Sequence, residues 1–211
     1  MKNFVAIDTS NDYLTVLAYK DGKFACSHLP DCAMRHSVTL MNEVDKVLKE
    51  LSLSLDECDF FAASVGAGSF TGIRIGISAA KGFCTAFGKP ALPITSFEIA
   101  AYNTLDGGEK TLCLIDALHG AYYACGFDRE GNIVYPPAYI EEAEVLALQK
   151  EGYSLRSLKA VDLEGCAVVD PVEGFKNAVF AKAAREEFGE LSAVYVRKSS
   201  AEINLERGSS V

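Results

Sequence analysis

Residues 64–76 read Ser-Val-Gly-Ala-Gly-Ser-Phe-Thr-Gly-Ile-Arg-Ile-Gly, and this stretch decides how the rest of the chain is interpreted. The apolar run Phe60–Val65 that leads into it predicts a buried strand. Residues 66–72 predict a loop, because glycine adopts backbone angles that other residues avoid. Ile73–Phe87 predicts a helix. The unit is therefore a strand, a glycine-rich loop and a helix.

The predicted helix has two apolar stripes when its residues are placed at about 100° intervals. The first stripe consists of Ile73, Ile77, Ala80, Cys84 and Phe87. The second consists of Ile75, Ala79, Phe83 and Ala86. A helix that lies on one sheet needs one apolar face, so either its own domain buries both stripes or one of them contacts another protein chain.

We predict that the first stripe faces the partner, since the small side chains at 76 and 80 would allow another helix to approach closely. A neighbouring helix predicted over Ser37–Leu51 would complete the surface with its exposed part. The predicted partner interface comprises Ile73, Arg74, Ile77, Ala80, Lys81 and Cys84, together with Leu40 and Val44. The same surface could pair with a second copy of the chain.

The glycine-rich loop does not carry the common catalytic motifs. A phosphate-binding loop of the Walker type needs Lys and then Ser or Thr after its last glycine, whereas Ile73 and Arg74 follow here. A nucleophile elbow around Ser69 fails as well, because its flanking positions hold Ala67 and Thr71. Backbone N–H groups at a helix start can still bind an anion, and a tight turn without a ligand is the alternative. The candidate anion or nucleotide contacts are Asp8, Thr9, Ser10, Gly68, Ser69 and Thr71.

The composition indicates a globular protein. The chain has 211 residues with a net charge of −9, which argues against nucleic-acid binding by this surface alone. Seven cysteines without a Cys-x-x-Cys pair predict reduced core thiols in a cytoplasmic protein. No apolar run reaches the roughly 18 residues of a membrane span, and we expect no signal peptide.

The two halves of the chain resemble one another. Phe4–Asp8 has a counterpart in Leu112–Asp116, and the turn at Asp21-Gly22 has one at Glu130-Gly131. We predict an α/β protein with two lobes, 1–105 and 106–211, each with a mixed sheet and flanking helices. Further expected elements are strands at 13–19, 23–29, 91–94, 122–127, 165–169 and 193–196, helices at 96–102, 141–150 and 175–188, and a linker at 106–109. The last residues are expected to return to the first lobe.

This duplicated arrangement resembles the fold of actin, sugar kinases and Hsp70, which is related to ribonuclease H. Within it, Ile7-Asp8-Thr9-Ser10, the 66–76 run, Ile115-Asp116-Ala117 and Tyr195-Val196-Arg197 resemble the TsaB (YeaZ) family. The resemblance covers nearly the whole chain. Three positions depart from the usual family pattern: Ala67 replaces Pro, Val38 replaces Glu and Leu118 replaces Arg.

The resemblance implies a bacterial protein that binds and activates TsaD, the enzyme that places threonylcarbamoyladenosine on tRNAs reading ANN codons. TsaE would complete the assembly, and TsaC would supply the threonylcarbamoyl-adenylate. This chain would contact tRNA only as part of the complex. ATP and Mg²⁺ would be used by the complex, with no cofactor bound by this chain alone. A homodimer is implied for the free protein.

An enzyme of the same superfamily, either a nucleotide hydrolase or a metalloprotease, is the alternative function. The three histidines, His28, His36 and His119, lack the close spacing of a metal-binding pair on a helix. Asp8 and Asp116 could direct Mg²⁺, but we expect each to bond the adjoining turn instead. We therefore assign no catalytic and no metal-ligating residue.

Overall fold

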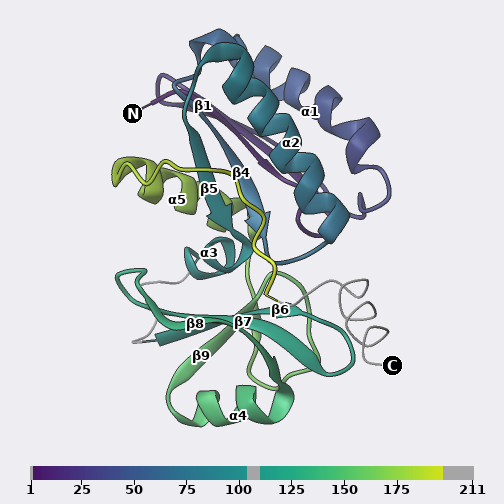
Figure 1. Ribbon diagram of the computed structural model, residues 1–211, viewed down its shortest axis with the longest axis vertical. Helices are drawn as coiled ribbons and strands as arrows, with labels where there is room; N and C mark the ends of the chain where they lie inside the picture. The colour runs from purple at the N-terminus through teal and green to yellow at the C-terminus, as the bar shows by residue number, and fades with distance from the viewer. Residues whose placement is uncertain (1, 104–109, 197–211) are drawn as a thin grey trace, which may run out of the picture.

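The computed structural model describes residues 2–103 and 110–196 and shows two lobes, each built on a five-stranded sheet (Figure 1). The first sheet comprises β1 (Phe4–Asp8), β2 (Leu14–Lys20), β3 (Lys23–Leu29), β4 (Phe60–Gly66) and β5 (Ala91–Thr95). The second comprises β6 (Lys110–Asp116), β7 (Ala121–Asp128), β8 (Ile133–Glu141), β9 (Tyr153–Ser157) and β10 (Ala167–Val168). The predicted linker at 106–109 and the polar tail lie outside the described residues.

The two sheets have the same topology. Their strand orders are β3-β2-β1-β4-β5 and β8-β7-β6-β9-β10, so the first strand of each unit is central. In both, that strand pairs antiparallel with the second strand of its unit and parallel with the fourth. The duplication predicted from sequence is therefore present in the fold.

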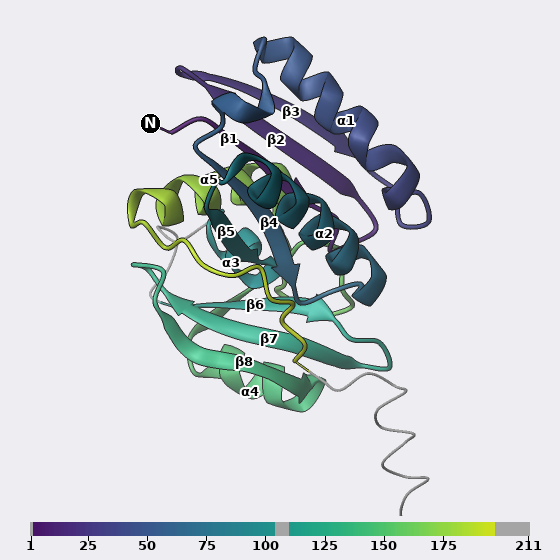
Figure 2. The ribbon, with the colours of Figure 1, turned by 45° about the horizontal axis from the view of Figure 1, so that its top comes forward.

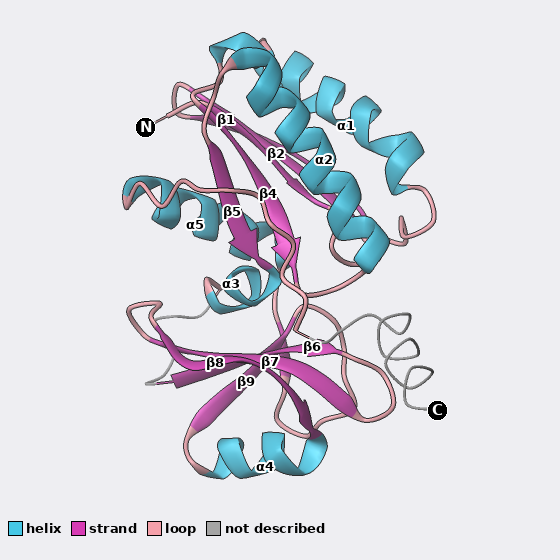
Figure 3. Cartoon of the chain, viewed as in Figure 1, coloured by secondary structure: helices cyan, strands magenta, loops and turns pink. Residues whose placement is uncertain are grey.

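Helices cover both faces of the first sheet (Figures 2 and 3). The helices of the described residues are α1 (His36–Leu51), α2 (Phe70–Phe87), α3 (Ser96–Ala101), α4 (Glu142–Lys150) and α5 (Pro171–Ala184), with a 3-10 turn, η1 (Leu55–Glu57). α1 and α2 lie on one face of the first sheet, and α5 lies on the other. α4 covers the outer face of the second sheet. The glycine-rich loop thus leads into a helix that shares a sheet face with α1.

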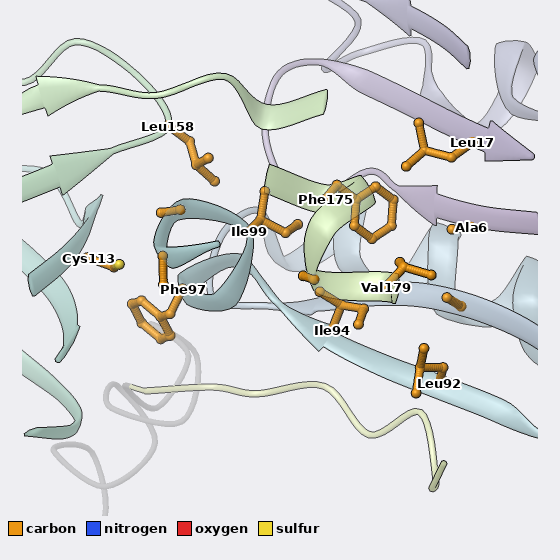
Figure 4. Close-up of a cluster of buried hydrophobic side chains, with 14 of the residues drawn as sticks. Ala6, Leu17, Leu92, Ile94, Phe97, Ile99, Cys113, Leu158, Phe175 and Val179 are labelled. Atoms are coloured by element: carbon orange, nitrogen blue, oxygen red, sulfur yellow. The ribbon is translucent and has the colours of Figure 1, made fainter. Parts of the chain in front are cut away.

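A single hydrophobic core joins the lobes. α3 lies between them, and its Phe97 and Ile99 belong to the same buried cluster as Cys113 of the second sheet and Phe175 of α5 (Figure 4). Gly174 of α5 allows this contact, because a Cβ there would lie 1.9 Å from the carbonyl oxygen of Ile99. The lobes are therefore packed against each other through α3.

The C-terminal part of the described chain returns to the first lobe. After α5, the backbone N–H of Gly189 donates to the Ala91 carbonyl at 2.9 Å, and that of Val194 donates to the Val65 carbonyl at 2.7 Å. We call residues 189–196 the return segment. It runs beside β4 and α2 without forming the strand predicted at 193–196.

Several predicted elements differ from those observed. The second lobe has no counterpart of α2, since only a loop joins β9 to β10. β9 itself was missed, although the alternation of Tyr153, Leu155 and Ser157, all buried, is typical of a strand. α5 begins at Pro171 instead of residue 175, because Asp170 caps its N-terminus.

All seven cysteines are free thiols, and four of them are buried. No helix in the described parts of the chain is long and apolar enough to cross a membrane.

Candidate functional site

The glycines of the 66–76 run bring α2 against the end of β1. A Cβ at Gly68 would lie 2.2 Å from the Ser10 carbonyl oxygen, and one at Gly72 would lie 2.0 Å from the Thr9 carbonyl oxygen. Hydrogen bonds close the same contact: Ser69 N–H donates to the Ser10 carbonyl, and Thr9 Oγ1 donates to the Gly72 carbonyl. The motif therefore serves close backbone approach.

α2 begins three residues earlier than predicted, because Ser69 is its N-cap. The Ser69 side chain accepts a hydrogen bond from Gly72 N–H. Two of the backbone donors in the loop that could have held an anion, Ser69 N–H and Gly72 N–H, are thus already bonded within the protein.

The first apolar stripe of α2 is core, and its assignment to a partner interface was wrong. Ile73, Ile77 and Ala80 are buried against Ala63 and Val65 of β4 and against Leu191 of the return segment. The sequence pattern could not show this, because Leu191, which covers the stripe together with β4, lies more than 100 positions away. Cys84 is half-buried and contacts the cluster under α1 instead.

Val44 was also wrongly assigned to the interface, whereas Leu40, although only 3% exposed, lines the groove described below. Both are buried between α1 and the first sheet, together with Val5, Leu14 and Val16. Only Arg74 and Lys81 of the predicted set are exposed side chains, and Lys81 does not line the groove described below but lies 3.5 Å from Glu190. The predicted elements are those that form the open surface, but most of the predicted residues point away from it.

The open surface is a groove between α1 and α2, with a volume of about 540 Å³. Its lining residues are Ser37, Leu40 and Met41 of α1 and Phe70, Thr71, Arg74, Ile75, Ser78 and Ala79 of α2. Met41 and Phe70 are large apolar side chains left 52% and 43% exposed. Met34, just before α1, and Val38, in its first turn, are also large apolar side chains that are exposed. The second stripe of α2 contributes Ile75 and Ala79, which sequence analysis found without assigning them to this side.

A second concavity, of about 280 Å³, lies between the lobes. This cleft is lined by three of the six predicted anion contacts, Ser10, Gly68 and Ser69. A fourth, Thr71, lines the α1–α2 groove instead. Asp8 and Thr9 are buried and line neither, so their assignment as ligand contacts was wrong. The cleft also contains the carboxylates Asp12 and Asp116, and its one cation, Lys159, is paired with Asp12 at 2.6 Å. This balance of charge disfavours an anion.

Asp8 and Asp116 bond the adjoining turn, as predicted, but their surroundings differ. Asp8 Oδ1 accepts from Ser10 N–H at 2.8 Å, and Asp116 Oδ1 accepts from Leu118 N–H at 2.8 Å. Asp116 is exposed, whereas Asp8 is fully buried and its Oδ2 has no hydrogen-bond partner among the described residues. Burial raises the pKa of Asp8, and the bonds from Ser10 offset only part of that effect.

Asp8→Asn should therefore change how stability depends on pH. Because the folded protein holds the Asp8 proton more tightly than the unfolded chain does, this group makes the free energy of unfolding decrease as the pH rises above about 3.8. Urea unfolding of both proteins at several pH values from acid to neutral should show the wild type losing stability relative to Asp8→Asn. Parallel pH profiles would contradict a raised pKa. Asp116→Asn is the matched variant, since it makes the same change at the equivalent, exposed carboxylate of the second lobe.

Nothing in the described parts of the chain groups three or more His, Cys, Asp or Glu side chains closely enough to hold a metal ion. His36, one of the three histidines considered above, is buried with Nε2 at 2.9 Å from the Tyr13 carbonyl oxygen. It therefore holds the start of α1 against the chain before β2.

Comparison with known proteins places this geometry in a family. Residues 29–198, well over half of the chain, match the family described as TsaD: tRNA N6-adenosine threonylcarbamoyltransferase. Among curated proteins, the Escherichia coli tRNA threonylcarbamoyladenosine biosynthesis protein TsaB is 29% identical over 133 residues, which are 62% of this chain and 57% of that protein. A tRNA N6-adenosine threonylcarbamoyltransferase from Chelativorans is 37% identical over 95 residues, 44% of this chain and 24% of that protein. The chain spans 54–63% of the length of the first curated relatives that it matches.

The fold agrees with these matches. A Pseudomonas aeruginosa structure described as similar to peptidase YEAZ superposes with a TM-score of 0.78 at 22% identity, covering 93% of this chain and all of that one. The predicted fold class, a duplicated α/β fold with two lobes that each hold a mixed sheet and flanking helices, is confirmed by this likeness and by the matching strand orders of the two sheets. The chain belongs to the TsaD family of proteins and, within it, to the TsaB (YeaZ) group.

Proposed function

We propose that this chain is a non-catalytic subunit of the bacterial complex that makes threonylcarbamoyladenosine on tRNA, and that it binds and activates TsaD through the α1–α2 groove. The observation that carries the proposal is the groove itself, where Met41 and Phe70 are exposed beside Ile75 and Ala79. An apolar surface of this kind on a folded chain marks a protein interface. The chain also matches a transferase locally, so a partner with a similar fold would present equivalent helices.

A non-catalytic role is supported by the structural use of the glycine-rich loop and of the polar groups around it. The loop glycines hold α2 against β1, and Asp8 is buried within the first lobe. The interlobe cleft holds more carboxylates than cations. These residues therefore stabilise the fold, and chemistry on tRNA is left to the partner.

The assembly would be cytoplasmic, where its tRNA substrate is, and TsaE would join the pair. ATP and Mg²⁺ would be used by the assembled complex. In the absence of TsaD the same groove would be covered by a second copy of this chain, so the homodimer and the TsaD complex would compete for it.

The experiment is a binding titration of purified chain with TsaD from the same organism. Met41→Glu places a charge in the groove at an exposed position, so the variant should fold while its binding to TsaD, its self-association and its support of tRNA modification are lost. Lys46→Gln is the matched control. It changes the net charge by the same amount, lies outside the groove lining and contacts Glu43 of its own helix at 3.5 Å. If Met41→Glu bound TsaD with the same affinity as the wild type does, the interface would lie elsewhere.

A further inference from the structure

The lining of the α1–α2 groove contains one charged side chain, Arg74. The rest of the lining is apolar or carries hydroxyl groups. Arg74 lies in the second turn of α2 and is exposed. An occupant of the groove therefore meets apolar surface and a single positive charge.

Arg74 is held in place by two aromatic rings from distant parts of the chain. Its guanidinium carbon lies 3.8 Å from the centre of the Phe70 ring, and its Nε donates to Tyr195 Oη at 3.0 Å. The Phe70 and Tyr195 rings contact each other, with centres 5.1 Å apart. Tyr195 belongs to the return segment, whose backbone is fixed one residue earlier by the bond between Val194 and Val65.

This arrangement fixes the side chain but leaves its outer donors unused. In the parts of the chain that the structure describes, no carboxylate lies within ion-pair distance of Arg74, and Nη1 and Nη2 have no partner. By contrast, Lys81, the other exposed cation of α2, is 3.5 Å from Glu190. A guanidinium presents its donors as a planar fork that matches a carboxylate, and one that is already immobilised loses less side-chain entropy on binding.

We infer that Arg74 is a preorganised receptor for a carboxylate on an amphipathic helix of the partner, seated in the groove so that its apolar face covers Met41 and Phe70. This inference rests on the proposed function and names the chemistry of the partner surface. A helix that binds in a groove uses an apolar face and places polar anchors at the rim. A carboxylate is favoured over a phosphate because the groove has one guanidinium and no second cation to balance the larger charge.

If this inference holds, the return segment is part of the surface that binds the partner, because its Tyr195 positions Arg74. Tyr195 is 45% exposed and fixes the direction of the guanidinium through its hydroxyl group. Tyr195→Phe keeps the ring against Phe70 and removes only that hydrogen bond. It should weaken binding less than removal of the guanidinium does.

The test measures the dissociation constant of the full-length chain for TsaD at low and high salt. Arg74→Met should weaken binding by about tenfold or more at low salt, the loss expected for a charge-assisted bidentate pair. The wild-type dissociation constant should rise with salt, and that of Arg74→Met should change much less, because salt screens charge pairs at an exposed rim. Arg74→Lys should restore the salt dependence and only part of the affinity. Circular dichroism and thermal melting should show that each variant is folded.

Lys81→Met is the matched control, since it removes one positive charge from the same helix outside the groove lining. It should bind TsaD as the wild type does. If Arg74→Met keeps wild-type affinity and salt dependence while Met41→Glu abolishes binding, Arg74 is not a carboxylate receptor, but the groove is still the interface with TsaD. If the wild type and Lys81→Met both fail to bind TsaD, the proposed function itself is refuted. Competition by inorganic phosphate that requires Arg74 would show a phosphate site and overturn the carboxylate assignment.

Discussion

Gly72→Ala should abolish folding or lower the free energy of unfolding by about 3 kcal/mol or more, at or above the upper end of ordinary overpacking. The added Cβ would lie 2.0 Å from the carbonyl oxygen of Thr9. That oxygen belongs to backbone at the end of the central strand β1, and Thr9 is itself hydrogen-bonded to Gly72. Neither element can move away without separating α2 from the sheet.

Gly82→Ala is the control on the same helix. Apart from the helix's own backbone and the neighbouring residues, no atom of the described residues lies within 4 Å of a Cβ built there, so the change should stabilise the protein by about 0.5–1 kcal/mol through better helix propensity. Urea unfolding of the two variants would check both expectations. Equal stability of Gly72→Ala and the wild type would show that the contact between β1 and α2 is looser than described here.

Ala80→Glu should unfold the protein or lower its free energy of unfolding by at least about 3–5 kcal/mol, because it introduces an unpaired charge into a core. Ala80 is fully buried with Ile73 and Ile77 under the return segment. If the stripe faced a partner, as predicted from the sequence, the expected result would be a folded monomer that fails to bind that partner. Burial of the stripe changes the expected result from lost association to lost folding.

Ala86→Glu is the matched control, since it places the same side chain on the exposed part of the same helix. Its stability should remain within about 1 kcal/mol of the wild type. Thermal melting and circular dichroism of both variants would test this difference. A folded, stable Ala80→Glu protein would mean that the return segment does not cover α2 in solution.

Local features of the chain predicted the elements of the first lobe well. Apolar runs and turn residues located β1 to β4 to within a residue or two, because each strand is bounded by Gly, Asp, Asn or Pro. The similarity of Phe4–Asp8 to Leu112–Asp116 predicted a duplication that the strand orders confirm. The second lobe was predicted less well, because its β10 is a short exposed strand and its β9 is followed by no helix.

The two apolar stripes of α2 show what periodicity in the sequence can and cannot predict. Periodicity showed that the helix has apolar residues on two sides, which is a property of the chain itself. It could not show which side remains open, because that depends on Leu191 and Val194, which approach α2 only after the chain has passed through the second lobe and α5.

The glycine-rich run, the two lobes and the family were determined by the sequence alone, since close backbone approach and strand periodicity are local requirements. The exposed groove and the fixed guanidinium were decided only by the tertiary structure. Arg74 is an ordinary helix residue until Tyr195, 121 positions later, accepts a hydrogen bond from its Nε and packs its ring against Phe70. Such a contact follows from how the return segment packs against β4, and no spacing in the chain encodes it.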